Sequence, residues 1–246
     1  MARCRVAILG NGPAMTAPVP VAAKAVTEHT RLRRVLTHPL AHLVYAMIVV
    51  GLLQAFIVKL YYVPSGSMEP TLMPGDRIIV NRIALSWDTP STGDIVVFDA
   101  GDRWSETDVE LSIWQHLRYA FGAMTGIGPA APNTLVKRVI ATEGQTLACC
   151  DAEGRMLVDG NPLDEPYVDV DFPWEPGLLD CSTSPGSLRC FESFTVPDGA
   201  FVALGDNRTA SSDSLSNCRL TGQVDASCLR VGELDRIIGF QSTMAQ

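Results

Sequence analysis

The sequence predicts a mostly β fold that follows one N-terminal membrane-spanning helix. Three observations carry this prediction: a single long apolar run, a series of short Val- and Ile-rich segments after it, and no repeated alternation of strands with long helices. Such alternation is typical of parallel α/β folds, which are therefore not expected. The net charge of −8 argues against a nucleic-acid-binding protein, because such a protein needs a basic face.

The apolar run covers residues 40–58 and contains no Asp, Glu, Lys or Arg. This is about the length that a bilayer-spanning helix needs, so we expect a transmembrane helix over residues 40–60. Three arginines lie just before the run, at positions 31, 33 and 34. The positive-inside rule then predicts a cytoplasmic tail over residues 1–39 and an extracytoplasmic domain over residues 61–246. The protein is expected to be a single-pass protein of the plasma membrane, with the lipid bilayer as a partner.

A cleaved signal peptide is the alternative interpretation of this region. The triplet Ser65-Gly66-Ser67 has the small-x-small pattern of a cleavage site. However, the apolar run is longer than the usual core of a signal peptide, and Pro64 lies inside the would-be site. A retained membrane helix is therefore favoured.

The outer part of the chain predicts short strands joined by turns. Six segments are rich in Val and Ile and are bounded by Gly, Asp, Asn or Pro: 76–84, 93–100, 134–142, 155–160, 199–206 and 234–241. Two insertions interrupt them. Residues 105–132 contain a segment, 112–124, that predicts a short amphipathic helix, and residues 149–195 predict a cysteine-stapled loop or cap.

Six of the seven cysteines lie after residue 145, which suits disulfides in an oxidising compartment. Cys181 with Cys190, and Cys218 with Cys228, are close enough in sequence to pair. The connectivity within the full set stays open, and buried thiols are the alternative: Cys149, Cys150, Cys181, Cys190, Cys218 and Cys228. A metal site would need tight C-x-x-C pairs with histidines nearby, and neither occurs in the sequence, so no metal is expected.

A hydrolytic site in the outer part needs a base other than histidine. Three of the four histidines precede or enter the apolar run, so a Ser-His-Asp triad would depend on His116 alone. Lys137 is the better candidate, because alternation in a strand places it on one face with Leu135 and Val139. Burial there would lower its pKa from about 10.4, and the neutral amine could then act as a base. A solubilising lysine at an exposed edge is the alternative.

Four motifs follow the apolar run in a fixed order: PSGSMEPTL (64–72), the strands MPGDRIIVNR and TGDIVVF, LVKRVIATEGQ, and GDNRTASSDS (205–214). In this order they resemble the bacterial type I signal peptidases, the Ser-Lys enzymes that remove signal peptides from exported preproteins. The resemblance covers the chain from about residue 40 to its end. It implies an antiparallel β-sheet catalytic core with an inserted β cap, cleavage after small-x-small residues of a membrane-held signal peptide, and no cofactor.

The resemblance also assigns roles to individual residues. It implies that Ser67 is the nucleophile and that Lys137 is the general base, which later protonates the leaving amine. Ser65 matches the position whose hydroxyl helps to form the oxyanion hole beside the Ser67 backbone N–H. Ser211 matches the serine that hydrogen-bonds and orients the lysine. The alternatives are that Ser65 and Ser67 are ordinary turn residues and that Ser211 is a turn serine.

Further matches concern the substrate pockets and the last motif. The shallow pockets of the family correspond to Val63, Met68, Leu72, Leu135 and Val136, and Met68 is also expected to keep the lysine dry. Asp206 and Arg208 belong to the structural last motif, and Asp213 matches an acidic residue near the site. An ion pair between Arg208 and Asp213 with no catalytic part is a further alternative. The sequence departs from the family where Leu215 replaces an arginine, which leaves the ion pairs around Asp213 open.

Two other functions compete with this interpretation. A soluble Ser-Lys self-cleaving peptidase shares the catalytic core, but the apolar run and the acidic charge speak against it. A membrane-anchored, catalytically inactive binding domain would be expected to lack one member of the dyad, whereas Ser67 and Lys137 are both present. Lys137 also excludes the relatives that use a histidine in its place.

Overall fold

The computed structural model describes residues 37–104, 112–125, 133–219 and 221–242. The chain divides into two units, residues 1–48 and residues 49–246. Helix α2 (Pro39–Phe56) contains this division. Within the described residues, no helix combines the length and the apolar character that a membrane crossing requires. The tail expected over residues 1–39 lies mostly outside the described residues.

The helix expected over residues 40–60 is shorter at its C-terminal end. It ends at Phe56, and Val58–Tyr62 form strand β1, which pairs with β2 (Arg77–Asn81) in an antiparallel register from Val58 opposite Asn81 to Tyr62 opposite Arg77. The mostly apolar composition of residues 57–60 suited either structure, and hydrogen bonding to β2 decides in favour of the strand.

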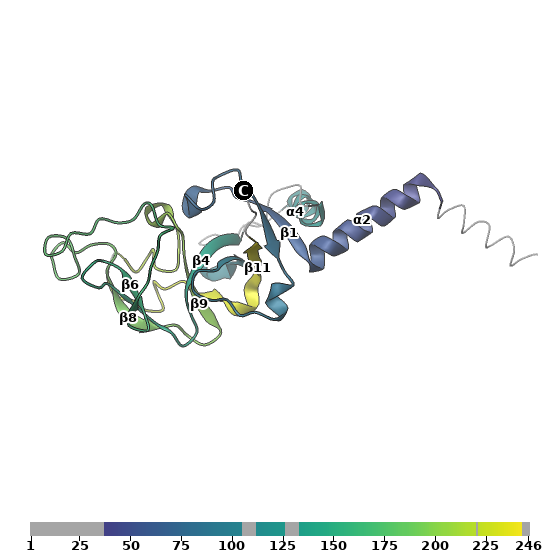
Figure 1. Ribbon diagram of the computed structural model, residues 1–246. Coiled ribbons are helices and arrows are strands. Elements are labelled where there is room, and N and C mark those ends of the chain that lie inside the picture. Colours follow the sequence, from purple (N-terminus) through teal and green to yellow (C-terminus); the bar gives the residue numbers. More distant parts are fainter. Residues whose placement is uncertain (1–36, 105–111, 126–132, 220, 243–246) are drawn as a thin grey trace, which may run out of the picture. The chain divides into compact units, whose positions relative to one another are not determined.

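Both sheets are antiparallel, which confirms the mostly β fold. The larger sheet has seven strands in the order β1-β2-β11-β3-β4-β9-β10 (Figure 1). Its remaining strands are β3 (Ile95–Asp99), β4 (Thr134–Thr142), β9 (Ala200–Leu204), β10 (Gly232–Glu233) and β11 (Ile237–Ser242). β4 lies between β3 and β9, so any side chain on it is shielded by neighbouring strands on both sides.

The smaller sheet is built from the chain between β4 and β9. Its strands run in the order β7-β6-β5-β8: β7 (Asn161–Pro162), β6 (Met156–Val158), β5 (Thr146–Cys149) and β8 (Phe191–Thr195). This sheet overlaps the insertion expected over residues 149–195, although its first strand begins slightly earlier. We refer to residues 146–195 as the cap segment.

The six segments that predicted strands all contain one. Each strand is shorter than the predicted range except β4, which matches it, and β11 extends one residue beyond its range. The short strands β1, β5, β7, β8 and β10 were not predicted, because they carry few Val or Ile residues or lie in the cysteine-rich insertion. The amphipathic helix expected over residues 112–124 is α4 (Ile113–Thr125), and a one-turn helix, α3 (Gly101–Trp104), precedes it.

Three apolar clusters form the core. The first joins the two sheets through residues such as Ile140, Leu147 and Leu215. The second lies under the β1–β2 hairpin and includes Met68 and Leu72, while the third includes Phe98 and Phe201, whose rings meet edge to face.

The cysteine pairs suggested by sequence proximity are close in space. The Cα atoms of Cys181 and Cys190 are 5.5 Å apart and those of Cys218 and Cys228 are 5.0 Å apart, which are ordinary disulfide separations. The sulfur of Cys150 also lies within 4.8 Å of those of Cys181 and Cys190. A bridge in the first pair would close a loop of the cap segment, and a bridge in the second would close the loop that follows Asp213.

Candidate active site

Ser67 lies on a single 3-10 turn, η1 (Gly66–Met68), a few residues after β1. The prolines on either side of PSGSMEP disfavour a longer helix, and the small residues allow a tight turn. Ser67 is buried, and its backbone carbonyl accepts a hydrogen bond from the Asn207 N–H at 3.1 Å. The motif of residues 64–72 and that of residues 205–214 are thus joined directly through the backbone at Ser67.

Lys137 lies on the central strand β4, opposite Val96 of β3. Its side chain is only 3% exposed, and its Nζ is 2.7 Å from the Ser67 Oγ. Among the described residues, no carboxylate lies within ion-pair distance of Nζ. The alternative of an exposed, solubilising lysine is therefore wrong, and the structure brings the two predicted members of the dyad into hydrogen-bond contact.

Burial lowers the pKa of Lys137 from its ordinary value of 10.5 to about 8, because the charged ammonium loses its hydration. The negative charges of Asp213 and Asp206 act in the opposite direction and raise the pKa. The lowered value means that a substantial fraction of the amine is neutral near pH 8 and can accept a proton from Ser67.

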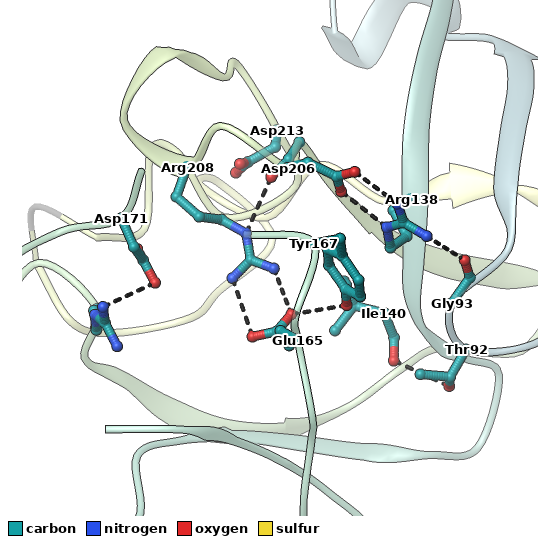
Figure 2. A network of polar contacts seen from close by, with 12 residues as sticks. Thr92, Gly93, Arg138, Ile140, Glu165, Tyr167, Asp171, Asp206, Arg208 and Asp213 are labelled. Atoms are coloured by element: carbon teal, nitrogen blue, oxygen red, sulfur yellow. Dashed lines mark hydrogen bonds and ion pairs between the residues drawn. The ribbon is translucent and has the colours of Figure 1, made fainter. Parts of the chain in front are cut away.

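Arg138 follows Lys137 directly and is also buried, but it has a full set of partners. Its Nε donates to Asp206 Oδ1 at 2.9 Å and its Nη2 to Asp206 Oδ2 at 2.6 Å, while Nη1 donates to the Gly93 carbonyl at 2.8 Å (Figure 2). Asp206 also accepts a hydrogen bond from Thr71 Oγ1. Alternation along β4 sends the two basic side chains to opposite faces, so Asp206 pairs with Arg138, whereas no carboxylate among the described residues pairs with Lys137.

The cap segment contacts the Arg138–Asp206 pair. The guanidinium of Arg138 lies over the Tyr167 ring at 3.8 Å from its centroid, and the Tyr167 hydroxyl donates to Glu165 at 3.0 Å. Glu165 in turn pairs with Arg208 (Figure 2). The Nε of Arg208 also donates to the Gly205 carbonyl. The ion pair considered between Arg208 and Asp213 is therefore wrong: the insertion supplies Glu165, a partner that no motif could indicate.

Asp213 pairs instead with Arg219, six residues later, at 3.3 Å. Asp213 is fully buried, and Arg219 lies with its guanidinium 4.8 Å from the ring centroid of Phe172 in the cap segment. Leu215, which stands where the family has an arginine, is buried in the core cluster that joins the two sheets. The cation near Asp213 is thus present, but it comes from a different position.

Ser211 does not make the expected hydrogen bond to the lysine. Its Oγ is buried and has no hydrogen-bond partner in the described part of the chain. It lies against Gly205, where an added Cβ would come under 3.0 Å from both the Ser211 Oγ and the Ser67 carbonyl oxygen. The close approach of these two groups therefore requires glycine at position 205 and places the hydroxyl beside the turn that carries Ser67.

Ser65 is exposed, and its Oγ lies 3.4 Å from the Ser67 Oγ. It therefore lies on the solvent side of the nucleophile, whereas Lys137 approaches from the interior.

The residues expected to line substrate pockets belong to two different clusters. Val63, Met68 and Leu72 are buried together, with Val136 packed against them, whereas Leu135 packs in the cluster around Phe98. Leu135 thus lies apart from the other four, because adjacent residues of a strand face opposite sides of the sheet. A separate cavity lies beside Arg138, and Leu72 contributes to its lining.

Several residues that build the site were not predicted. Thr71, Arg138 and Asn207 lie inside the quoted motifs next to predicted residues, so their positions were a usable signal. Glu165, Tyr167 and Arg219 lie outside the motifs, and only the fold brings them near the dyad.

Comparison with known proteins gives a consistent result. The family model described as signal peptidase, peptidase S26, matches residues 36–236. The chain is 37% identical over 188 residues to the signal peptidase I of Mycobacterium tuberculosis (strain CDC 1551 / Oshkosh), covering 72% of this chain and 61% of that protein. It is 37% identical over 197 residues to a probable signal peptidase I of Mycobacterium leprae (strain TN), covering 74% and 65%.

The chain thus spans less than two thirds of the length of these relatives. Among solved structures, a signal peptidase I from Enterococcus faecalis V583 aligns with 63% of this chain and 98% of that chain, with 21% identity and a TM-score of 0.34. This last likeness is too remote to support an inference.

Proposed function

Because the chain belongs to the signal peptidase family, peptidase S26, we propose that it is a serine endopeptidase that removes signal peptides from exported preproteins with a Ser67–Lys137 dyad. The observation that carries this proposal is the 2.7 Å contact between Lys137 Nζ and Ser67 Oγ in a buried site. A nucleophile within hydrogen-bond reach of a base is the arrangement that covalent hydrolysis requires. An inactive binding domain would have no reason to keep a lysine buried without a counter-ion.

The reaction begins when neutral Lys137 takes the proton of the Ser67 hydroxyl as Oγ attacks the scissile carbonyl carbon. Collapse of the tetrahedral intermediate breaks the C–N bond, and the Lys137 ammonium gives its proton to the leaving amine. An ester to Ser67 remains. Lys137 then accepts a proton from a water molecule that attacks this ester, and the released Ser67 oxygen regains a proton.

Two other serines are proposed to assist. The exposed Ser65 hydroxyl, close to Ser67 Oγ, would donate with the Ser67 N–H to the oxyanion. A buried hydroxyl without a partner normally costs about 1–3 kcal/mol, so it is uncommon outside functional sites. Ser211 has such a buried hydroxyl among the described residues, and we assign a functional role to it. Its Oγ would accept a hydrogen bond from Lys137 when the lysine is protonated.

The substrate is proposed to be a membrane-held signal peptide with small residues at the first and third positions before the cut. Val63, Met68, Leu72 and Val136 form an apolar floor next to Ser67 that suits small side chains. The chain is proposed to be anchored in the plasma membrane by the apolar run of residues 40–58, with the N-terminus in the cytoplasm and the dyad outside. This placement would bring Ser67 close to the bilayer surface, where the target bond lies.

The test is cleavage of a preprotein by the full chain in detergent, compared with Ser67→Ala and with Ser91→Ala as a matched control. Ser91 is exposed and is not one of the residues whose side chains contact Ser67 or Lys137. We expect mature product from the wild type and from Ser91→Ala, and none from Ser67→Ala. Cleavage by Ser67→Ala at the wild-type rate would disprove the proposal, and no cleavage by a folded wild type would favour an inactive domain.

A further inference from the structure

Helix α4 (Ile113–Thr125) lies in the insertion that the proposed reaction does not use (Figure 1). At 3.6 residues per turn, Ile113, Trp114 and Leu117 fall on one side of the helix, and Gln115, His116 and Arg118 fall on the other. A helix with this pattern normally buries its apolar side. Here Ile113 is 69%, Trp114 75% and Leu117 55% exposed, so the apolar side faces solvent.

The size of this apolar side argues against a second protein as its natural cover. A helix of 13 residues is about 20 Å long and about 10 Å wide, so one side offers roughly 200 Å². A stable protein–protein interface needs about 800 Å² from each partner. The side is also a ridge of protruding side chains, with Phe121 at 58% exposed among them, rather than a groove, and it includes a tryptophan, which favours the interface between lipid and water.

We infer that α4 lies in the surface of the lipid bilayer, with Ile113, Trp114 and Leu117 in the acyl boundary and Arg118 at the level of the headgroups. An interfacial helix has this composition: aromatic and aliphatic residues on one side, a basic residue on the other and no acidic residue within it. The inference rests on the proposed function, because a chain that is already held at the membrane needs only weak additional affinity for this contact.

The sequence next to α4 sets the expected lipid dependence. Glu106, Asp108 and Glu110 precede the helix, so attraction to anionic headgroups is opposed by nearby negative charge. Apolar contact should therefore dominate, and the interaction should form on zwitterionic phosphatidylcholine as well as on phosphatidylglycerol. A purely electrostatic contact would instead require the anionic lipid.

The test uses the full chain reconstituted in phosphatidylcholine nanodiscs whose acyl chains carry bromine, which quenches tryptophan only on contact. We compare the wild type with Trp114→Phe, which keeps the helix apolar but removes the reporter. The loss of tryptophan emission through quenching is expected to be at least twice as large in the wild type as in Trp114→Phe. Equal quenching of the two proteins would overturn the inference.

A second variant tests the contact itself. Ile113→Gln combined with Leu117→Gln keeps good helix formers but removes the apolar side, and Gln115→Ser on the opposite side is the control. We expect the double variant to lose more than half of the Trp114-dependent quenching and the control to keep it. Unchanged quenching in the double variant would contradict the inference, as would a soluble dimer that the double variant converts to a monomer.

The same proteins separate this inference from the proposed function. If no variant cleaves any substrate but Trp114 is still quenched, the proposed function fails and the lipid contact stands. If a short soluble peptide is cleaved normally but Trp114 is not quenched, the lipid contact fails and the proposed function stands.

Discussion

Replacing Arg219 with glutamine is expected to move the activity profile to higher pH. The negative charge of Asp213 raises the pKa of Lys137 against the effect of burial. Arg219 is the ion-pair partner of Asp213 at 3.3 Å, and both side chains are buried. Without the guanidinium, the charge of Asp213 is no longer offset, so the ammonium form of Lys137 gains stability and its pKa rises from about 8.

The size of the shift follows from Coulomb's law. At an effective dielectric of about 20, a unit charge at a separation on the order of 12 Å contributes about 1.4 kcal/mol, or about one pKa unit, and we take an effect of this order for the loss of the Arg219 charge. With a pKa of about 8, roughly one lysine in eleven is neutral at pH 7, and a rise of one unit would leave about one in a hundred. We therefore expect about a tenfold loss of kcat/KM at pH 7 and almost no loss at pH 10.

The assay is kcat/KM for a soluble peptide between pH 6 and pH 10, with Arg219→Lys as the matched control that keeps the charge. The lysine variant is expected to follow the wild-type profile. Asp213→Asn should move the profile in the opposite direction, and the double variant Asp213→Asn with Arg219→Gln should lie near the wild type. A profile of Arg219→Gln that coincides with the wild type, or that moves to lower pH, would refute the reasoning.

Three further predictions concern stability and covalent structure. Lys137→Met should abolish cleavage and raise the free energy of unfolding at pH 7 by about 3 kcal/mol, measured by urea denaturation. The lowered pKa destabilises the fold fully below about pH 8, and this effect disappears as the pH rises to 10.5; an equal gain at pH 11 would contradict it. Arg138→Gln should cost about 3–5 kcal/mol because Asp206 is left buried and unpaired, whereas the exposed Arg77→Gln should change little; equal effects would argue against a structural role of the pair. Reduction should add about 2 Da per bridge to the intact mass if Cys181–Cys190 and Cys218–Cys228 are oxidised, and an unchanged mass would exclude both bridges.

The dyad could be predicted because its two members lie in short motifs that resemble those of a known family, and each motif has strong local structure. Lys137 occupies a strand whose alternation of side chains was visible in the residues around it, and its burial and lowered pKa follow from that strand being central. Ser67 lies between prolines that fix a turn. Local patterns of this kind survive folding because they depend on neighbours within a few residues.

The ion pairs around the dyad could not be predicted, because they join residues far apart in sequence. Glu165 lies 43 positions from Arg208, and its segment is rich in turn residues that give no periodic signal. Arg219 is only six residues from Asp213, but no local rule selects it over other cations in the loop. The absence of an arginine at position 215 left the ion pairs around Asp213 open, and the loop that follows Asp213 presents another arginine to the same carboxylate.

The contrast between Lys137 and Arg138 explains how one strand can hold both a base and a structural cation. The two residues are neighbours on β4, and both are buried, so chemistry and partners must distinguish them. An arginine cannot lose its proton near neutral pH, so its burial requires a paired carboxylate, and Asp206 supplies two hydrogen bonds. A lysine can lose its proton, so burial without a carboxylate at contact distance converts it into a base. Exchange of the two residue types would therefore place an unpaired guanidinium against Ser67 and leave Asp206 with a weaker partner, which removes the base and the structural pair at once.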